Sequence, residues 1–272
     1  MAEPVGDSGS SAVSTDTKFE YWLDALEKRH LADLTFPQVS SALRALSSTY
    51  VERRQRIREG GALDGAGKRA AFALFYAPLH YLLVREIVRA LGEAAAQRTP
   101  VADHARGVPL VDLGCGTGAA GAAWGTISST PLEVIGLDRH PWAVAEAAET
   151  YRAFHLSART RRADIATAAL PKGPASIVAA FTLNEMDDAA RDTLMKRLVE
   201  RAGRGDRLLI VEPIAGFVAR WWNGWRAQIE AAGGRGDEWR FRVELPPIVA
   251  KLDRAAGLNH RELTGRSLWL AG

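Results

Sequence analysis

The feature that most constrains this chain is a glycine-rich stretch directly after a short apolar run. It reads Val111-Asp112-Leu113-Gly114-Cys115-Gly116-Thr117-Gly118 and leads into an alanine-rich segment that begins at Ala119. Glycines permit tight turns and a close approach of the backbone to a ligand, and the amides at a helix start attract negative charge. The stretch therefore predicts a strand, a loop that binds a nucleotide-like ligand, and a helix, in that order.

The glycine spacing alone does not identify the ligand. Gly114, Gly116 and Ala119 also satisfy the looser dinucleotide pattern, in which alanine replaces the last glycine. Asp112 lies two residues before Gly114, where a pyrophosphate would gain nothing from a negative charge. A nicotinamide-dependent oxidoreductase is therefore the less favoured alternative.

From Val108 onward, short apolar runs alternate with helical patterns, which is typical of a mostly parallel sheet covered on both faces. The predicted fold class is α/β, with a Rossmann-like, doubly wound sheet. We expect strands at Pro109–Leu113, Glu133–Leu137, Arg161–Asp164, Ser176–Phe181, Arg207–Glu212 and Trp239–Leu245, with a last strand or hairpin within His260–Leu270. We expect helices at Ala119–Ile127, Trp142–Leu156, Asp188–Ala202, Ile214–Ala232 and Pro247–Ala256.

The chain ahead of Val108 has a different character. Apolar residues recur at three and four positions between Lys18 and Leu91, which predicts a helical N-terminal region. Its strongest helix is expected at Arg69–Leu91, kinked or divided by Pro78. We predict a disordered tail at residues 1–17, a helical region with a linker at 18–106, and a ligand-binding α/β domain at 107–272.

Two more acids lie at the ends of predicted strands. Asp138 closes the second strand, where a carboxylate can accept hydrogen bonds from both hydroxyls of a ribose. Asp164 closes the third strand. Because the carboxyl ends of parallel strands meet at one edge of a sheet, Asp112, Asp138 and Asp164 should face one crevice. An aspartate before a helix is also a common cap, so the prediction rests on the acids and the glycines together.

The order and spacing of these residues, from Val108 to about Glu212, resemble the class I S-adenosylmethionine-dependent methyltransferases. The resemblance implies S-adenosyl-L-methionine as the cofactor. It places Asp112 near the ammonium group of the methionine part, Asp138 near the ribose and Asp164 near the adenine amino group. It also implies cofactor contacts from Gly114, Cys115, Gly116, Gly118, Arg139, Ile165 and Phe181.

In this family the acceptor side usually follows the fourth strand, here Phe181-Thr182-Leu183-Asn184-Glu185-Met186. Asn184 can hydrogen-bond an acceptor amine or the cofactor, and Glu185 can serve as a base or as an ion-pair partner. Both residues fit equally well as caps of the following helix. Tyr76 and His80 are further catalytic candidates if their helix lies across the crevice. The Asn-Pro-Pro-Tyr pattern of some amino-group methyltransferases is absent, which disfavours that kind of acceptor.

A second, more diffuse resemblance involves the methyltransferase-like family associated with the mitochondrial small ribosomal subunit, and its bacterial relatives. It rests on Val39–Ser47 with Tyr50, on Arg69–Glu86, on Leu183–Glu185 and on Val211–Pro213. The cysteines that hold an iron–sulfur cluster in that family are missing, because the chain has one cysteine, so we expect no metal.

Arginine-rich runs leave two kinds of methyl acceptor open. Arg53, Arg54, Arg56 and Arg58 form one run, and Arg159, Arg161 and Arg162 another. Such runs can contact the phosphates of RNA or of the ribosome, although most are simply solvated. A small-molecule acceptor fits the sequence equally well.

Composition sets the outer limits. A single cysteine excludes a disulfide framework and fits a reducing cytoplasm, and no apolar run approaches the roughly 20 residues of a bilayer span. We therefore expect a cytoplasmic protein without membrane contact. An alternative function is a cofactor-binding ribosome assembly factor that has lost catalysis, but the glycine loop is intact. The sequence leaves the oligomeric state open.

Overall fold

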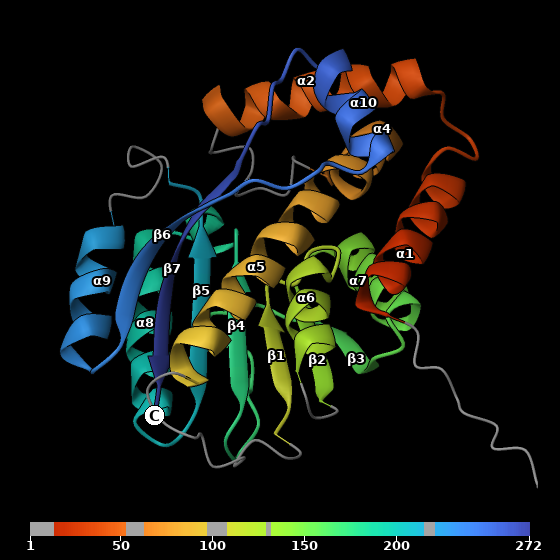
Figure 1. Cartoon of the computed structure of the whole chain (residues 1–272). Helices are drawn as coiled ribbons and strands as arrows, with labels where there is room; N and C mark the ends of the chain where they lie inside the picture. The colour runs from red at the N-terminus through yellow and green to blue at the C-terminus, as the bar shows by residue number, and fades with distance from the viewer. Residues whose placement is uncertain (1–13, 53–62, 97–107, 129–131, 215–220) are drawn as a thin grey trace, which may run out of the picture.

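The computed structural model describes residues 14–52, 63–96, 108–128, 132–214 and 221–272. Its centre is a seven-stranded sheet in the order β3-β2-β1-β4-β5-β7-β6 (Figure 1). The first five strands run parallel, and β7 is antiparallel to both β5 and β6. The predicted α/β class is confirmed. The strands are β1 (Leu110–Leu113), β2 (Glu133–Asp138), β3 (Ser157–Arg162), β4 (Ser176–Ala180), β5 (Arg207–Glu212), β6 (Arg235–Phe241) and β7 (Leu263–Ala271).

The strand predictions are accurate in the middle of the sheet and shifted at its edges. The bounds of β5, which is buried almost throughout, are those predicted. In contrast, β3 lies at Ser157–Arg162 rather than Arg161–Asp164, and β6 at Arg235–Phe241 rather than Trp239–Leu245. Both are edge strands with few buried residues, so their apolar pattern carries little information about their bounds.

Helices cover both faces of the sheet (Figure 1). One face carries α5, α6 and α7, with α1 packed outside α7, and the other carries α8 and α9. Three further helices, α2, α4 and α10, lie beyond the carboxyl ends of the parallel strands. The bounds are α1 (Thr15–His30), α2 (Phe36–Glu52), α4 (Ala66–Ala71), α5 (Ala77–Ala96), α6 (Ala119–Ile127), α7 (Pro141–Ala153), α8 (Asp188–Ala202), α9 (Trp222–Ala231) and α10 (Pro247–Ala255).

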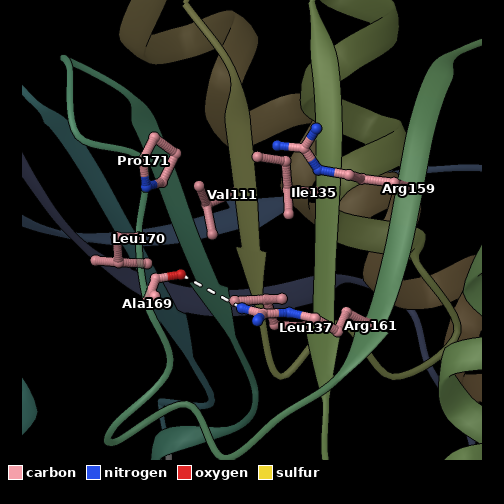
Figure 2. Close-up of a pocket in the computed structure, with 8 residues that line it drawn as sticks. All are labelled: Val111, Ile135, Leu137, Arg159, Arg161, Ala169, Leu170 and Pro171. Carbon is pink, nitrogen blue, oxygen red and sulfur yellow. Dashed lines mark hydrogen bonds between the residues drawn. The ribbon is translucent and has the colours of Figure 1, made fainter.

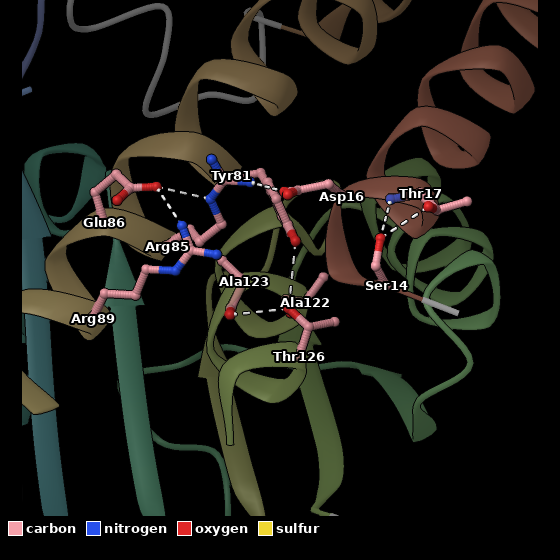
Figure 3. Close-up of polar contacts among 10 residues, drawn as sticks. All are labelled: Ser14, Asp16, Thr17, Tyr81, Arg85, Glu86, Arg89, Ala122, Ala123 and Thr126. Atoms are coloured by element: carbon pink, nitrogen blue, oxygen red, sulfur yellow. Dashed lines mark hydrogen bonds and ion pairs between the residues drawn. The ribbon is translucent and has the colours of Figure 1, made fainter. Parts of the chain in front are cut away.

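The N-terminal region is helical, but its limits differ from the prediction. Helix α1 begins at Thr15, because the Ser14 hydroxyl caps it by accepting the Thr17 N–H at 3.2 Å (Figure 3). The end of the predicted tail is therefore ordered, and residues 1–13 lie outside the described residues. Helix α5 continues to Ala96, past Leu91, where the predicted helix ends, and residues 97–107 also lie outside the described residues.

The helix predicted at Arg69–Leu91 changes its winding but is not divided. Helix α4 passes into α5 through a π-helical turn, η2 (Phe72–Tyr76), where the Ala77 N–H donates to the carbonyl of Phe72. Pro78 follows at once and has no N–H to donate. Single π-turns are often found at functional sites. Pro78 thus coincides with a local widening of a continuous helix.

The helical run Ala66–Gly92 is the one stretch among the described residues with the length and apolar composition of a membrane-spanning helix. Within the structure, 67% of its most apolar part is buried against the rest of the protein. Packing in the core accounts for this composition.

One hydrophobic cluster joins the N-terminal helices to the sheet domain. Trp22 of α1 is fully buried, and its indole N–H donates to the Thr150 hydroxyl of α7 at 3.1 Å. The Trp22 ring also packs on Tyr81 and Phe154, with centroids 5.7 and 5.4 Å away. At the surface, Arg85 of α5 reaches Asp16 of α1 at 3.1 Å (Figure 3). The predicted helical region and the α/β domain therefore share one core.

We expect Trp22→Ala to lower the free energy of unfolding by about 3 to 5 kcal/mol, because it empties a buried site at this junction. Urea denaturation followed by circular dichroism and by fluorescence measures the effect. The neighbouring Tyr21 is 64% exposed, so Tyr21→Ala is the matched control and should have little effect. Separate transitions for the two regions of the wild type would contradict a shared core.

Candidate functional site

The sheet reverses its winding between β1 and β4, since β2 and β3 lie on one side of β1 and β4 and β5 on the other. Open parallel sheets bind ligands outside the carboxyl ends of the strands at such a point. The loops that follow β1, β2 and β4 meet here. They contain Gly114–Gly118, Asp138–His140 and Phe181–Glu185, so segments distant in sequence form one candidate site.

The glycines of the first loop are required by its backbone. Gly114, Gly116 and Gly118 have φ values of 64°, 51° and 80°, which other residues rarely adopt. At Gly114 a Cβ would also overlap the side chain of Thr182, from the loop after β4. At Gly116 a Cβ would meet nothing nearer than a ring carbon of Phe72, 3.9 Å away. The loop thus presents bare backbone at Gly116, as a closely bound ligand requires.

Asp138 holds this loop and is still accessible. Its Oδ2 accepts the Gly116 N–H at 3.0 Å and its Oδ1 accepts the His140 N–H at 2.8 Å, while the side chain is only partly buried. Each carboxylate oxygen has a further lone pair, so Asp138 can hold the loop and also accept hydrogen bonds from two ribose hydroxyls. The bare glycines and this carboxylate fit an adenosine-containing cofactor.

The sequence predicts that Asp112 faces a crevice, but in the structure its side chain is buried. Its side chain is 1% exposed, and its Oδ2 accepts the Gly121 N–H and the Tyr151 hydroxyl, both at 2.8 Å. Burial raises the pKa of Asp112 to about 6, although both hydrogen bonds favour the carboxylate. The structure gives this residue a role in fixing α6 and α7 to the glycine loop. Its contact with a cofactor ammonium group stays a prediction.

The remaining candidates from the sequence lie around this centre. Asp164 is exposed, two residues past β3, and its Oδ1 accepts the Ala166 N–H of a turn at 2.9 Å, while Ile165 is buried. Cys115 is buried in the loop, and burial raises the pKa of its thiol well above its usual range, so it is suited to packing. Within the described ranges, no three His, Cys, Asp or Glu residues gather into a metal site.

The helix that carries Tyr76 and His80 lies beside the loop after β4. Phe181, the first residue after β4, has a positive φ of 59°, and its ring stacks on His80 with centroids 3.8 Å apart. Phe72 and Tyr76 lie 6.0 and 6.1 Å from the same imidazole. We call these four residues the aromatic cluster. Strained backbone of the Phe181 kind is often found at functional sites. Burial lowers the pKa of His80 to about 3, so its imidazole is neutral at pH 7.

Asn184 is engaged at both ends of its amide. It donates to Glu212 Oε2 at 2.5 Å and accepts the Trp221 indole N–H at 3.1 Å. Glu212 is fully buried and also accepts the Leu183 N–H at 3.0 Å, and burial raises its pKa to about 8. This network fixes the loop after β4 to the end of β5. Asn184 therefore acts as a positioning group in this arrangement.

Glu185 is a titratable group in the loop after β4. It ends a short 3₁₀ turn, η3 (Leu183–Glu185), its side chain is 33% exposed, and its nearest cation is Arg139, 4.0 Å away. Desolvation raises the pKa of Glu185 to about 7, which Arg139 opposes and Asp138 reinforces. The protonated and ionised forms are therefore both populated near neutral pH, which suits a group that accepts a proton.

Residues 110–203 match the family model described as a methyltransferase domain. The segment that holds the glycine loop is therefore similar to a methyltransferase domain, and the cofactor that this similarity indicates is S-adenosyl-L-methionine. The matched segment contains the glycine loop, Asp138 and Glu185, whereas the N-terminal helices and the aromatic residues they contribute lie outside it.

A curated relative is the carboxy-S-adenosyl-L-methionine synthase of Sodalis glossinidius (strain morsitans), which is 31% identical over 108 residues. The alignment covers 39% of this chain and 44% of the relative, so the chain matches under half of that protein's length. Similar solved structures include the magnesium protoporphyrin IX methyltransferase from Synechocystis PCC 6803 with bound S-adenosylhomocysteine, with a TM-score of 0.45 and 15% identity, covering 80% of this chain and 92% of that one. Another is the N-methyltransferase NodS from Bradyrhizobium japonicum, with a TM-score of 0.43 and 14% identity, covering 61% and 78%.

The buried Asp112 should make stability depend on pH. Burial raises its pKa from 3.8 to about 6, so the native state binds the proton more tightly than the unfolded chain. The contribution of Asp112 to the free energy of unfolding is fully present below about pH 4, and it falls by about 3 kcal/mol as the pH rises past 6. Asp112→Asn keeps an acceptor for Gly121 and Tyr151 but cannot ionise, so this fall should disappear.

Urea denaturation at intervals from pH 4 to pH 7 measures this difference. Asp192→Asn, at an exposed position on α8, is the matched control and should retain the wild-type pH dependence. The same fall in Asp112→Asn as in the wild type would assign the pH dependence to other groups.

Asp138→Ala should weaken the binding of S-adenosyl-L-methionine by about 1 to 3 kcal/mol, because it leaves ligand hydroxyls unpaired. Calorimetry with S-adenosylmethionine, S-adenosylhomocysteine and NAD measures it, with Asp192→Ala as control and circular dichroism to verify folding. Unchanged affinity would limit Asp138 to holding the loop. Tight binding of NAD alone would overturn the assignment of the cofactor.

Proposed function

We propose that this chain transfers the methyl group of S-adenosyl-L-methionine to a small-molecule acceptor bound beside the aromatic cluster. The observation that carries the proposal is the convergence of the cofactor loop and the Glu185 carboxylate at one edge of the sheet. When bound, the cofactor would supply an electrophilic methyl group on its sulfonium; the acceptor would attack the methyl carbon in line, and the thioether S-adenosylhomocysteine would leave.

Residues of the chain bind and orient the reactants, and one of them accepts a proton. Asp138 orients the ribose, and Glu185 accepts the proton of an acceptor O–H or N–H as the bond to the methyl group forms. The neutral His80, stacked on Phe181, forms an uncharged wall next to a cationic cofactor. Such a wall limits water at the reacting atoms and offers a surface for a planar, apolar acceptor.

The arginines in the second basic run have partners within the protein, which favours a small acceptor over RNA. Arg159 pairs with Glu133 of β2 at 2.8 Å, and Arg162 donates to the carbonyl of Arg139 at 3.0 Å. The first run, Arg53 to Arg58, lies outside the described residues. RNA or ribosome contact is the second candidate, supported by the exposure of these arginines and by the resemblance to the ribosome-associated family. A cytoplasmic location fits either acceptor.

A transfer assay tests the proposal and separates the alternatives. The protein is incubated with methyl-labelled S-adenosyl-L-methionine and fractionated cell extract, with and without ribonuclease. We expect label in the low-molecular-weight fraction that survives ribonuclease. Label that is lost on ribonuclease treatment would identify RNA as the acceptor, and cofactor binding without any transfer would favour an assembly factor.

The rate of methyl transfer should rise with pH through an apparent pKa of about 7, because the ionised form of Glu185 accepts the proton. In Glu185→Gln we expect this rise to disappear and kcat to fall by roughly 100-fold. The matched control is Glu149→Gln, a partly exposed position on α7. A pH–rate profile unchanged in Glu185→Gln would remove Glu185 from the reaction.

A further inference from the structure

The face of the sheet that carries α8 and α9 has an opening over β1, β2 and β3 (Figure 2). In doubly wound sheets a helix normally joins successive parallel strands and covers such a face. Here residues 163–175 join β3 to β4 without a helix or a strand. Part of the apolar face of the sheet is therefore not covered by a helix.

This irregular connection is held in a fixed position by two arginines of α8. Arg197 and Arg201 donate hydrogen bonds to its backbone carbonyl oxygens, those of Ala166, Ala168, Pro171 and Gly173. Arg201 is itself fixed by Asp206 at 2.5 Å. A loop held at four carbonyls does not collapse onto the sheet, so the opening belongs to the folded architecture.

The opening is a cavity of about 370 Å³. Its floor consists of Val111, Ile135 and Leu137, and the loop residues Leu170 and Pro171 form one side (Figure 2). Arg159 and Arg161 form the opposite side. The volume lies within the range of roughly 300 to 1,000 Å³ that is usual for small-molecule sites.

The apolar floor is narrow, because its three residues come from the neighbouring strands β1 and β2, which lie about 4.8 Å apart. An extended apolar chain fits this width.

The arginine side makes one end of the cavity cationic. Arg161 donates to the Ala169 carbonyl at 3.5 Å, which is a weak contact, and no carboxylate in the described part of the chain pairs with it. Arg159 forms an ion pair with Glu133, with 2.8 Å between Nη1 and Oε1. Arginine combines an apolar stem with a planar donor group that matches a carboxylate, so Arg161 can contact both parts of an amphiphilic ligand.

We propose that this cavity binds a small amphiphile with one carboxylate and an unbranched apolar chain. The carboxylate binds Arg161, and the chain lies on Val111, Ile135 and Leu137. The cavity lies on the face of the sheet that carries α8, whereas the glycine loop lies at the carboxyl ends of the strands, and the proposal does not depend on the proposed methyl transfer.

Calorimetric titration of the full chain with octanoate tests the proposal. We expect one octanoate per chain, about tenfold weaker binding in Arg161→Gln, and about tenfold weaker binding of 1-octanol to the wild type, because each change removes a charge-assisted hydrogen bond. Leu170→Trp should abolish binding by filling the cavity. Arg152→Gln, an exposed position on α7 at the opposite face, is the matched control and should bind as the wild type does.

Binding of S-adenosyl-L-methionine to each variant verifies its fold and keeps the two sites distinct. Saturating cofactor should leave octanoate binding unchanged. Octanoate affinity that is unaffected by both Arg161→Gln and Leu170→Trp would overturn the proposal, as would displacement of octanoate by the cofactor. Displacement of octanoate by a single-stranded RNA would instead assign the arginines to phosphate binding.

Discussion

The arrangement of the site depends on one buried carboxylate. Asp112, the residue before the last of β1, receives hydrogen bonds from Gly121 of α6 and Tyr151 of α7, so a single oxygen connects β1 to both helices. A Cβ at Gly121 would lie 2.6 Å from this oxygen, so a glycine is required at this position of α6. The cost of burying the charge is visible in its raised pKa, and it is offset by the two donors. The rigid loop that results can hold Gly114 against the loop after β4.

The N-terminal helices contribute Phe72, Tyr76 and His80 to the candidate site. They lie outside the matched methyltransferase segment but share its hydrophobic core, so the continuous helix runs along one face of the sheet and carries η2 to the carboxyl ends of the strands. The π-helical turn and the positive φ of Phe181 bring two rings into contact from segments about 100 residues apart in sequence, with centroids 3.8 Å apart at His80. The aromatic cluster therefore combines one ring from the matched segment with three rings from the added helices.

The sequence predicts those parts of the structure that follow from local patterns. Apolar runs in the centre of the sheet locate β1 and β5, and the glycines locate the cofactor loop, because each depends on neighbouring residues only. The bounds of β3 and β6 fail, since edge strands are half exposed and alternate weakly. No pattern indicates that Tyr151 binds Asp112, as 39 positions separate them. The sequence predicts Asn184 as a candidate for the acceptor or the cofactor, whereas its hydrogen bonds to Glu212 and Trp221 depend on tertiary packing.

The connection between β3 and β4 shows how one local departure reshapes a face of the sheet. Without a helix there, the side chains of β1 and β2 need another cover, and the stems of Arg159 and Arg161 together with the fixed loop provide part of it. The same arginines that suggest RNA binding in the sequence are thus used in packing, since a long stem with a charged end can cover apolar surface and still reach solvent. The number of arginines in a sequence cannot distinguish RNA binding from packing, because the difference lies in which surface the apolar part of each arginine side chain covers. The apolar floor at Val111, Ile135 and Leu137 is the physical reason to assign the hollow to an amphiphile rather than to a polyanion.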